Sequence, residues 1–184
     1  AKVRPLAEDI LARAAGFDLD NELPKRLVHG DPKISNVIFN EKNEAVCLID
    51  LDTLASMPLA VELGDALRSW CAPQGEEIEQ DIDLDFFRAA VDGYAASIGQ
   101  LPGLGEREAI VDKLETISLE LAARFLADAL EESYFGWDAS RFESASEHNL
   151  VRARAQLALA KSVAGCKDDL RQIVYRAWGQ ARKH

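Results

Sequence analysis

The chain has 184 residues and a formal net charge of −11, from 21 Lys and Arg against 32 Asp and Glu. This length suits one domain with a buried core. With 48% apolar and 29% charged residues, the composition excludes long disorder, collagen and coiled coil. The acidic balance argues against binding to nucleic acid or anionic lipid, because both need a basic surface. We therefore expect a single domain over residues 1–184 that binds no nucleic acid and no membrane.

Cysteine usage and the N-terminal residues predict a cytoplasmic protein. Cys47, Cys71 and Cys166 are far apart and form no CxxC pair, so neither a disulfide framework nor a zinc site is expected. No apolar run is long enough to span a bilayer, and residues 1–16 lack the apolar stretch of a signal peptide. Reduced thiols without a leader are typical of the cytoplasm. Cys47 lies in the apolar run Ala45–Ile49, where we expect a small core residue.

The first part of the chain predicts one helix and a small β element. The helix is expected over Pro5–Ala15, where apolar residues recur at helical spacing. Short β-type runs follow at Leu27–Val28, Val37–Phe39 and Ala45–Ile49. The polar turn at 40–44 predicts that the last two runs pair as a hairpin, and we expect this hairpin to dock on the helical body.

From Val61 onward the pattern is helical, with a break at Leu101–Gly105. The expected helices are Val61–Cys71, Leu84–Ile98, Glu106 to about Glu132, Ser146–Ala164 and Asp168 to about Arg182. The long third helix is apolar on more than one side and should be largely buried. Seven acids between Glu76 and Asp92, against Arg88 alone, predict a solvated surface.

The β element carries a candidate catalytic constellation. The pattern HxDxKxxN occupies positions 29–36, and Asp50 ends an apolar strand fourteen positions after Asn36. A loop closed by the hairpin would bring Asp31, Asn36 and Asp50 to one end of the element. Two carboxylates there would repel each other and lose hydration at a cost, unless a cation lay between them.

Phosphoryl transfer needs this set of side chains. An acid receives the proton of the acceptor hydroxyl, an Asn and an Asp hold magnesium, and a Lys steadies the moving phosphoryl group. The order here matches the kinase catalytic loop and its metal-binding Asp. We therefore assign Asp31 as the base, Lys33 to the phosphoryl group, Asn36 and Asp50 to Mg²⁺, and His29 to holding the loop. A lone HxD or IDxD is common in turns and strands, so the prediction depends on the joint pattern.

These residues resemble the aminoglycoside phosphotransferase and choline kinase superfamily, which is protein-kinase-like in fold. In that superfamily, HGD or HND stands in place of the protein-kinase motif HRD, as at His29–Asp31. IDxD-type sequences stand in place of the protein-kinase motif DFG, as at Ile49–Asp52. A Gly-Asp-x-x-Arg segment follows, as at Gly64–Arg68. The resemblance implies a mostly helical α+β fold, a kinase-like C-terminal lobe with a small β-hairpin beside the catalytic loop. It also implies ATP as co-substrate and Mg²⁺ as cofactor, with Asp31 as base and Asn36 and Asp50 as metal ligands.

Further blocks look like the N-acetylhexosamine 1-kinase branch of that superfamily, over about Leu27 to Lys161. They are Ile49–Thr53, Gly64–Arg68, Arg124–Leu130, Tyr134–Phe135 and His148–Gln156. The resemblance implies an acceptor sugar held by Asp31, Asp52, Arg124 and Tyr134. Two departures are visible: Gly30 stands where the branch often has Asn, and the stretch from Arg124 to Tyr134 is about one residue shorter.

The residues themselves leave the acceptor site open. Arg124 lies in a helix that is apolar nearly all round, and its local partners would be Glu120 and Asp128 at helical spacing. Tyr134 belongs to an aromatic group that could stack on a sugar ring or form a core edge. We expect Asp65 and Arg68 of the Gly-Asp-x-x-Arg segment to support the catalytic loop rather than touch substrate.

The nucleotide-binding half of a kinase is not evident in the sequence. Only 28 residues precede His29, and they contain no Gly-rich run and no strand carrying a Lys. We expect a C-terminal lobe whose partner is a missing N-terminal lobe, and little activity from this chain alone.

Three interpretations follow from these patterns. The chain is the lobe of an ATP-dependent kinase for an amino sugar or other sugar. Alternatively, it serves an aminoglycoside or choline-like amino alcohol, where the acids at 76–92 would attract a cationic acceptor. The third is a non-catalytic kinase-like binding module, against which the intact set of Asp31, Asn36 and Asp50 argues.

Overall fold

The computed structural model describes residues 3–17, 22–99 and 101–180. Most of them form helices: α1 (Val3–Ala14), α2 (Leu59–Trp70), α3 (Leu84–Ser97), α4 (Leu104–Glu131), α5 (Ala145–Gly165) and α6 (Lys167–Gln180). Every predicted helix is confirmed, with no described end shifted by more than two residues; the expected end near Arg182 lies outside the described residues. Over these ranges, no helix is both long and apolar enough to traverse a bilayer.

Helix α4 begins inside the stretch that the sequence predicts as a break. Its first residue is Leu104, because the Glu106 carboxylate accepts a hydrogen bond from Gly103 N at 2.7 Å and caps the helix at that point. Glu106 is almost fully buried and also binds Arg26 through both guanidinium Nε and Nη2. The start of α4 therefore holds the strand that leads into residues 29–36, the predicted catalytic loop.

In the described part of the chain, four short strands form two antiparallel pairs. Strands β2 (Val37–Phe39) and β3 (Ala45–Leu48) pair as the predicted hairpin. Strand β4 (Ala55–Pro58), which the sequence does not predict, pairs with β1 (Lys25–Val28). Because β1 begins at Lys25, the expectation that no strand before His29 carries a Lys is wrong. The sequence of β4 has no β-branched residue and ends in proline, so it carries no strand signal of its own. Residues 29–36 join β1 to β2 and residues 49–54 join β3 to β4, so the two loops face each other between the two ladders.

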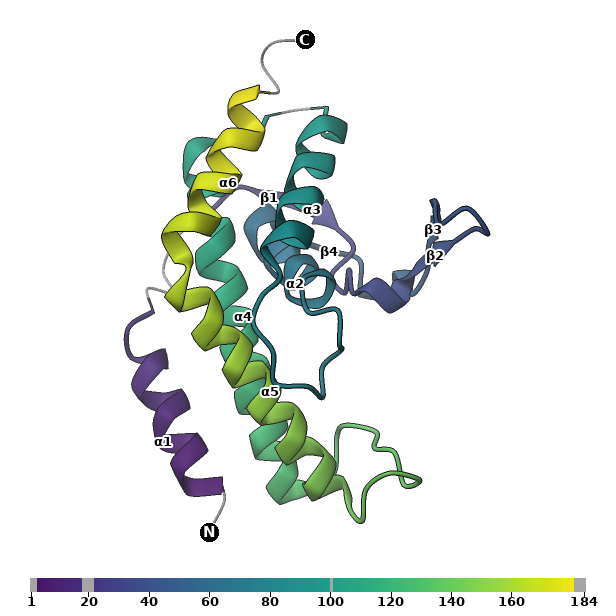
Figure 1. The fold of residues 1–184 in the computed structure, drawn as a ribbon, viewed down its shortest axis with the longest axis vertical. Helices are drawn as coiled ribbons and strands as arrows, with labels where there is room; N and C mark the ends of the chain where they lie inside the picture. The colour runs from purple at the N-terminus through teal and green to yellow at the C-terminus, as the bar shows by residue number, and fades with distance from the viewer. Residues whose placement is uncertain (1–2, 18–21, 100, 181–184) are drawn as a thin grey trace.

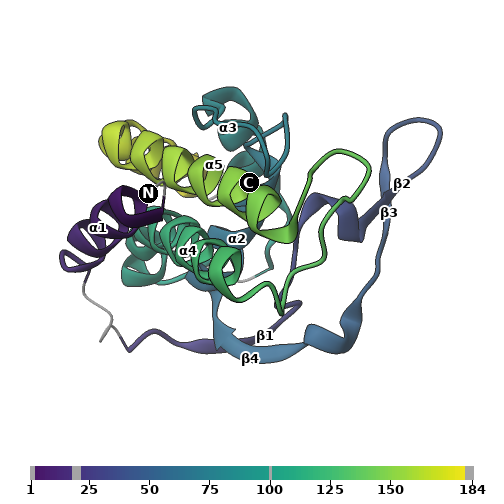
Figure 2. The same ribbon diagram turned by 90° about the horizontal axis from the view of Figure 1, so that it is seen from below.

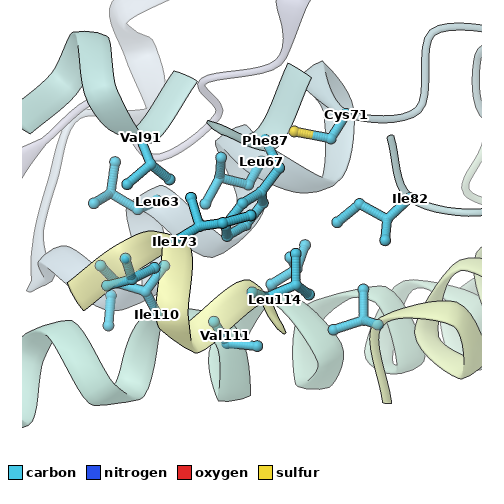
Figure 3. Packing of buried hydrophobic residues seen from close by; sticks show 14 of the residues in the cluster. Leu63, Leu67, Cys71, Ile82, Phe87, Val91, Ile110, Val111, Leu114 and Ile173 are labelled. Atoms are coloured by element: carbon cyan, nitrogen blue, oxygen red, sulfur yellow. The ribbon is translucent and has the colours of Figure 1, made fainter. Parts of the chain in front are cut away.

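The main core lies where α2, α3, α4 and α6 meet (Figure 3). Phe87 and Leu114 are fully buried within it. Gly64 lets α2 and α4 approach closely, because a Cβ at that position would lie 2.9 Å from Leu114 N. This glycine therefore has a packing role. The long helix α4 is largely buried, as predicted, and packs against α5 and α2 (Figure 1).

A second core forms between α1, α4 and α5, where α1 lies beside the two long helices (Figure 2). Ile10, Phe125 and Leu157 are buried there. This cluster fixes the C-terminal half of α4, which carries Arg124.

The β2–β3 hairpin projects from the helical body (Figures 1 and 2), so the expectation that it docks there is wrong. Every residue of β3 is exposed, including Cys47, which is not the predicted core residue. Apolar residues on both faces of this run indicate burial, but the described residues do not cover it. Large apolar side chains are exposed along the hairpin and its exit: Ile38, Phe39, Val46, Leu48 and Ile49.

Candidate functional site

Backbone contacts fasten the loop at 29–36 to the facing loop at 49–54. Ile49 N donates to Asn36 O at 3.0 Å, and Thr53 Oγ1 donates to His29 O at 2.8 Å. The buried His29 ring adds a third contact, since its Nε2 lies 2.8 Å from Ile49 O. These contacts fix Asp31 and Asp50, one on each loop, relative to each other.

His29 has the geometry of a scaffold residue. Its Nδ1 accepts from Asp31 N at 3.3 Å, so Nε2 carries the proton that goes to Ile49 O. Both ring nitrogens are thus occupied by backbone groups. This agrees with the predicted role of His29 in holding the loop rather than moving a proton.

Three side chains from the loops meet around one amide nitrogen. Asn36 Nδ2 donates to Asp31 O at 2.8 Å and lies 3.2 Å from Asp31 Oδ2 and 3.5 Å from Asp50 Oδ2. Lys33 Nζ contacts Asp31 Oδ2 at 2.6 Å, and this hydrogen bond raises the pKa of Lys33 above its ordinary value. The structure therefore brings together Asp31, Lys33, Asn36 and Asp50.

Asp50 stands in the left-handed backbone region, with φ of 69° and ψ of 50°. Asp and Asn tolerate this conformation better than most residues. The turn ends β3 and begins a short 3₁₀ helix at Leu51–Thr53, which directs the chain back towards β4.

Helix α2 supports the catalytic loop through side chains that the sequence analysis did not single out. Glu62 accepts hydrogen bonds from His29 N and Gly30 N, both at 3.0 Å. Ser69 Oγ accepts from Ile34 N at 3.0 Å, and Trp70 Nε1 donates to Pro32 O at 2.8 Å. From the sequence, Glu62 would be expected only to stabilise the N-terminus of α2, as acidic side chains in a first helical turn do. Only the fold shows that its carboxylate faces the loop.

Asp65 and Arg68 form no hydrogen bond or ion pair with residues 29–36 in the described part of the chain, so their predicted support of the loop is not seen as a direct bond. Arg68 is buried and pairs with Asp65 and Glu76, each at 2.8 Å. Glu77 binds Arg141 and His148, each at 2.7 Å. The first two acids of the predicted solvated surface are thus tied into ion pairs, whereas others of the stretch, Glu79, Asp81, Asp85 and Asp92, are exposed.

Gly30 is the second glycine with a specific geometric role. Its φ is +85°, and a Cβ there would lie 2.2 Å from Thr53 O. The Asn that often stands here in the similar branch would not fit without moving the 49–54 loop. Gly30 is therefore needed for the close approach of the two loops.

We expect Gly30→Ala to lower the free energy of unfolding by about 2–6 kcal/mol, because positive φ and overpacking each cost about 1–3 kcal/mol. Gly75→Ala is the matched control, since its φ is +88° and no atom lies within 4 Å of the added Cβ; we expect a loss of about 1 kcal/mol there. Urea titrations measure both. Equal losses would contradict the close contact with Thr53.

A cavity of about 650 Å³ opens on one side of the catalytic loop. Asp31, Lys33, Arg124 and Tyr134 all line it. Its lining also includes Glu62, Asp65, Glu76, Glu120, Arg68 and Arg152. The predicted base thus shares a cavity with two of the residues that the resemblance assigns to the acceptor.

Arg124 and Tyr134 interact with each other within this cavity. Arg124 Nη2 donates to Tyr134 OH at 3.2 Å, and the guanidinium lies 5.4 Å from the ring centroid. Glu120 lies 3.8 Å from the guanidinium, whereas Asp128 turns to the backbone after α4. Of the two local partners expected for Arg124, only Glu120 is present. Asp52 is exposed on the short 3₁₀ helix and does not line the cavity.

Comparison with protein families matches residues 2–97 to the model of the phosphotransferase enzyme family, APH. The match covers more than half of the chain and includes both loops, the hairpin, α2 and α3. The mostly helical α+β architecture with two small strand pairs is that of the kinase-like C-terminal lobe of this family. The chain belongs to the phosphotransferase enzyme family.

Proposed function

We propose that the chain is the catalytic and acceptor-binding lobe of an ATP-dependent kinase that transfers the γ-phosphoryl group to a hydroxyl of an amino sugar or other sugar. One observation carries the proposal: Asp31 lies in one cavity with the Arg124–Tyr134 pair and, on its other side, contacts the amide that reaches Asp50. A base between a polar acceptor cavity and a metal-binding pair is the arrangement that phosphoryl transfer requires.

Asn36 and Asp50 suit magnesium by their chemistry, because carboxylate and amide oxygens are hard ligands. Asn36 uses its Nδ2 for the two carboxylates, which leaves Oδ1 as its ligand atom. Within residues 3–17, 22–99 and 101–180, no three or more His, Cys, Asp or Glu side chains form a group that could hold a metal ion. Mg²⁺ bound by Asn36 and Asp50 would share its coordination with nucleotide phosphates and would neutralise their charge.

Asp31 and Lys33 act on the acceptor side of the reaction. Asp31 accepts the proton of the acceptor hydroxyl as that oxygen bonds to phosphorus. Asn36 orients the carboxylate by donating to Asp31 O and Oδ2. Lys33, in contact with Asp31, lies where a positive charge can stabilise the transferring phosphoryl group. Because the transition state is loose, much of the rate comes from holding these groups in place.

The Arg124–Tyr134 pair supports a sugar acceptor. The Arg124 side chain is 45% exposed and donates to Tyr134 OH, so further guanidinium N–H groups can reach hydroxyl or acetamido oxygens. Tyr134 is 71% exposed and offers a ring face. We retain Asp52 as a proposed acceptor contact, which would require movement of the 51–53 turn.

An aminoglycoside or amino-alcohol acceptor is the second candidate, and the acidic residues of the cavity support it. Five acidic residues line the space, Asp31, Glu62, Asp65, Glu76 and Glu120, against four basic ones, Lys33, Arg68, Arg124 and Arg152. Arg68 compensates Asp65 and Glu76, and Lys33 compensates Asp31. Binding of the acceptor by Arg124 would favour a sugar, whereas binding by Glu120 would favour a cationic acceptor.

We propose that the adenine of ATP binds against the hairpin. Ile38, Phe39 and Ile49 are exposed apolar side chains beside the Asn36–Asp50 pair. An apolar surface at this place suits the underside of a nucleotide base and a second lobe above it. A site completed by that lobe would be closed to water, which strengthens its electrostatic interactions.

We expect Arg124→Ala to raise the acceptor KM roughly tenfold to a hundredfold, the usual cost of losing hydrogen bonds from a charged group, and to leave the KM for ATP nearly unchanged. Steady-state kinetics of a protein containing this chain and the nucleotide-binding lobe measure both constants. Arg88→Ala, a comparably exposed arginine on α3, should change neither. An unchanged acceptor KM would contradict the role of Arg124.

A substrate panel tests the proposed function as a whole. ADP release from the two-lobed protein is followed with N-acetylhexosamines, neutral hexoses, aminoglycosides and choline. Turnover with the sugars alone supports the first candidate, and turnover with the cationic acceptors alone supports the second. No ADP release with any hydroxyl acceptor, from a protein that binds Mg-ATP, would favour a non-catalytic module.

A further inference from the structure

The block His148–Gln156 resembles a kinase branch in sequence, yet its buried polar residues have no part in the chemistry described above. His148 and Asn149 are almost fully buried in the first turns of α5. His148 Nδ1 accepts from Asp138 N at 3.2 Å. Arg152 Nη1 donates to Gly136 O at 2.8 Å. The block therefore faces the segment after α4, and this segment contains Tyr134.

Asp128, in the last turn of α4, is the centre of these contacts. It is 4% exposed, and its Oδ1 accepts from Ser133 N at 2.9 Å and Tyr134 N at 2.8 Å. Its Oδ2 accepts from Phe135 N and from Asn149 Nδ2, both at 2.9 Å. The backbone hydrogen bonds, that of Phe135 first, lower the pKa of Asp128 below its ordinary value. An ionised carboxylate thus gathers three successive backbone N–H groups.

The chain direction at the end of α4 makes this possible. Glu132 has φ of 51°, in the left-handed region, so the backbone reverses after the helix. The next three N–H groups then point back at the carboxylate one turn earlier. On the other side, Arg152 holds Gly136 O and lies 3.5 Å from Asn149 Oδ1. Residues 133–136 are therefore fixed from both α4 and α5.

This fixation decides where the Tyr134 side chain stands. Tyr134 is 71% exposed, so burial does not set its position. Its neighbour Phe135 packs against Phe125, with ring centroids 4.5 Å apart, and against the edge of Tyr134 at 4.8 Å. The backbone hydrogen bonds to Asp128 place both rings, and the Tyr134 hydroxyl then meets Arg124 in the cavity that contains Asp31.

We propose that Asp128 is a positioning residue for the acceptor site, which holds the backbone of residues 133–135 so that Tyr134 meets Arg124 beside Asp31. It does not line the cavity itself and acts only through the segment it binds. This proposal rests on the proposed function in one respect, namely that Tyr134 and Arg124 contact the acceptor.

Amide hydrogen exchange on the 184-residue chain tests the positioning without any activity. In Asp128→Asn we expect the amides of Ser133, Tyr134 and Phe135 to exchange roughly tenfold to a hundredfold faster, because they lose bonds to a charged acceptor. Asp83→Ala is the matched control, since that carboxylate accepts from Asp85 N and Phe86 N at the start of α3. It should leave residues 133–135 unchanged. Unaltered exchange at these amides in a folded Asp128→Asn would overturn the proposal.

Acceptor binding gives the second readout, with N-acetylglucosamine as the probe in a titration of the same variants. We expect Asp128→Asn to weaken binding to about the extent of Tyr134→Ala. If Tyr134→Ala weakens binding and Asp128→Asn does not, the positioning role is wrong. If Tyr134→Ala and Arg124→Ala leave binding of the probe intact, the acceptor assignment fails, and the role of Asp128 toward that acceptor fails with it.

A milder variant keeps the proposal testable if Asp128→Asn does not fold. Asn149→Ala removes one of the four donors to the same carboxylate. It should also make amide exchange at residues 133–135 faster and acceptor binding weaker, and both effects should be smaller than in Asp128→Asn. A folded Asn149→Ala with unchanged exchange at residues 133–135 and unchanged binding would count against the proposal.

Discussion

Replacing Asp50 by Ala should abolish phosphoryl transfer in a two-lobed protein and leave the helical body folded. Asp50 supplies the one carboxylate of the proposed metal pair, and Asn36 alone offers a single neutral oxygen ligand. The negative charge on the transferring group would then lack its main counter-charge. Turnover is measured as ADP release over a range of magnesium concentrations. Near-normal turnover of Asp50→Ala at low magnesium would show that the metal role is wrong.

The left-handed backbone of Asp50 requires a companion variant. At φ of 69°, alanine carries a conformational cost that asparagine largely avoids, so Asp50→Ala can shift the 49–54 loop as well as remove the ligand. Asp50→Asn keeps the turn and removes the charge, and it should also lose nearly all turnover. Asp85→Ala, a highly exposed acid on α3, is the control that should behave as the unchanged protein. Full activity in Asp50→Asn would restrict Asp50 to a role in the turn.

Replacing Asp31 by Asn should lower kcat roughly a hundredfold to ten-thousandfold, the usual scale for a general base. Asparagine fits the same space but cannot take up the proton of the acceptor hydroxyl. The substitution also removes the charge that pairs with Lys33 Nζ, so Lys33→Ala is measured alongside to separate that contribution. Single-turnover phosphoryl transfer at saturating acceptor is the appropriate measurement.

The loss in Asp31→Asn should appear in kcat much more than in the KM for ATP, because Asp31 lines the proposed acceptor cavity. Asp92→Asn, on the exposed face of α3, is expected to leave the rate unchanged. A loss of less than about tenfold would place Asp31 outside the proton transfer and leave positioning as the source of the rate.

Local sequence determines the catalytic loop because its spacing and its strands are local. The run Val37–Phe39, the polar turn at 40–44 and the run Ala45–Ile49 predict a hairpin, and a hairpin pairs neighbouring residues with little entropic cost. Once it forms, Asp31, Asn36 and Asp50 must converge, and their side chains do meet around Asn36 Nδ2. The helices were also predictable, since apolar residues at a spacing of three and four mark them without reference to the rest of the fold.

Other features depend on which surfaces meet, and the local pattern does not contain that information. The apolar run around Cys47 indicates a buried strand, yet the described part of the chain leaves it exposed. The segment Ala55–Pro58 becomes a strand only because the chain reverses at Asp50 and returns beside β1. Glu62 rather than Asp65 supports the catalytic loop because the rotation of α2, set by its packing on α4, turns Glu62 toward His29.

The sequence by itself determined the kind of chemistry, through residue types at fixed spacing in one continuous stretch that folds on itself. Only the tertiary structure decided how the proposed acceptor side is built, because its parts come from three distant regions of the chain. Arg124 lies on α4, Asp31 on the catalytic loop, and the contacts that hold Tyr134 come from Asp128 and the start of α5. Asp128 was expected beside Arg124 from helical spacing, but three backbone N–H groups outcompete one guanidinium, since they are presented together by the turn after α4.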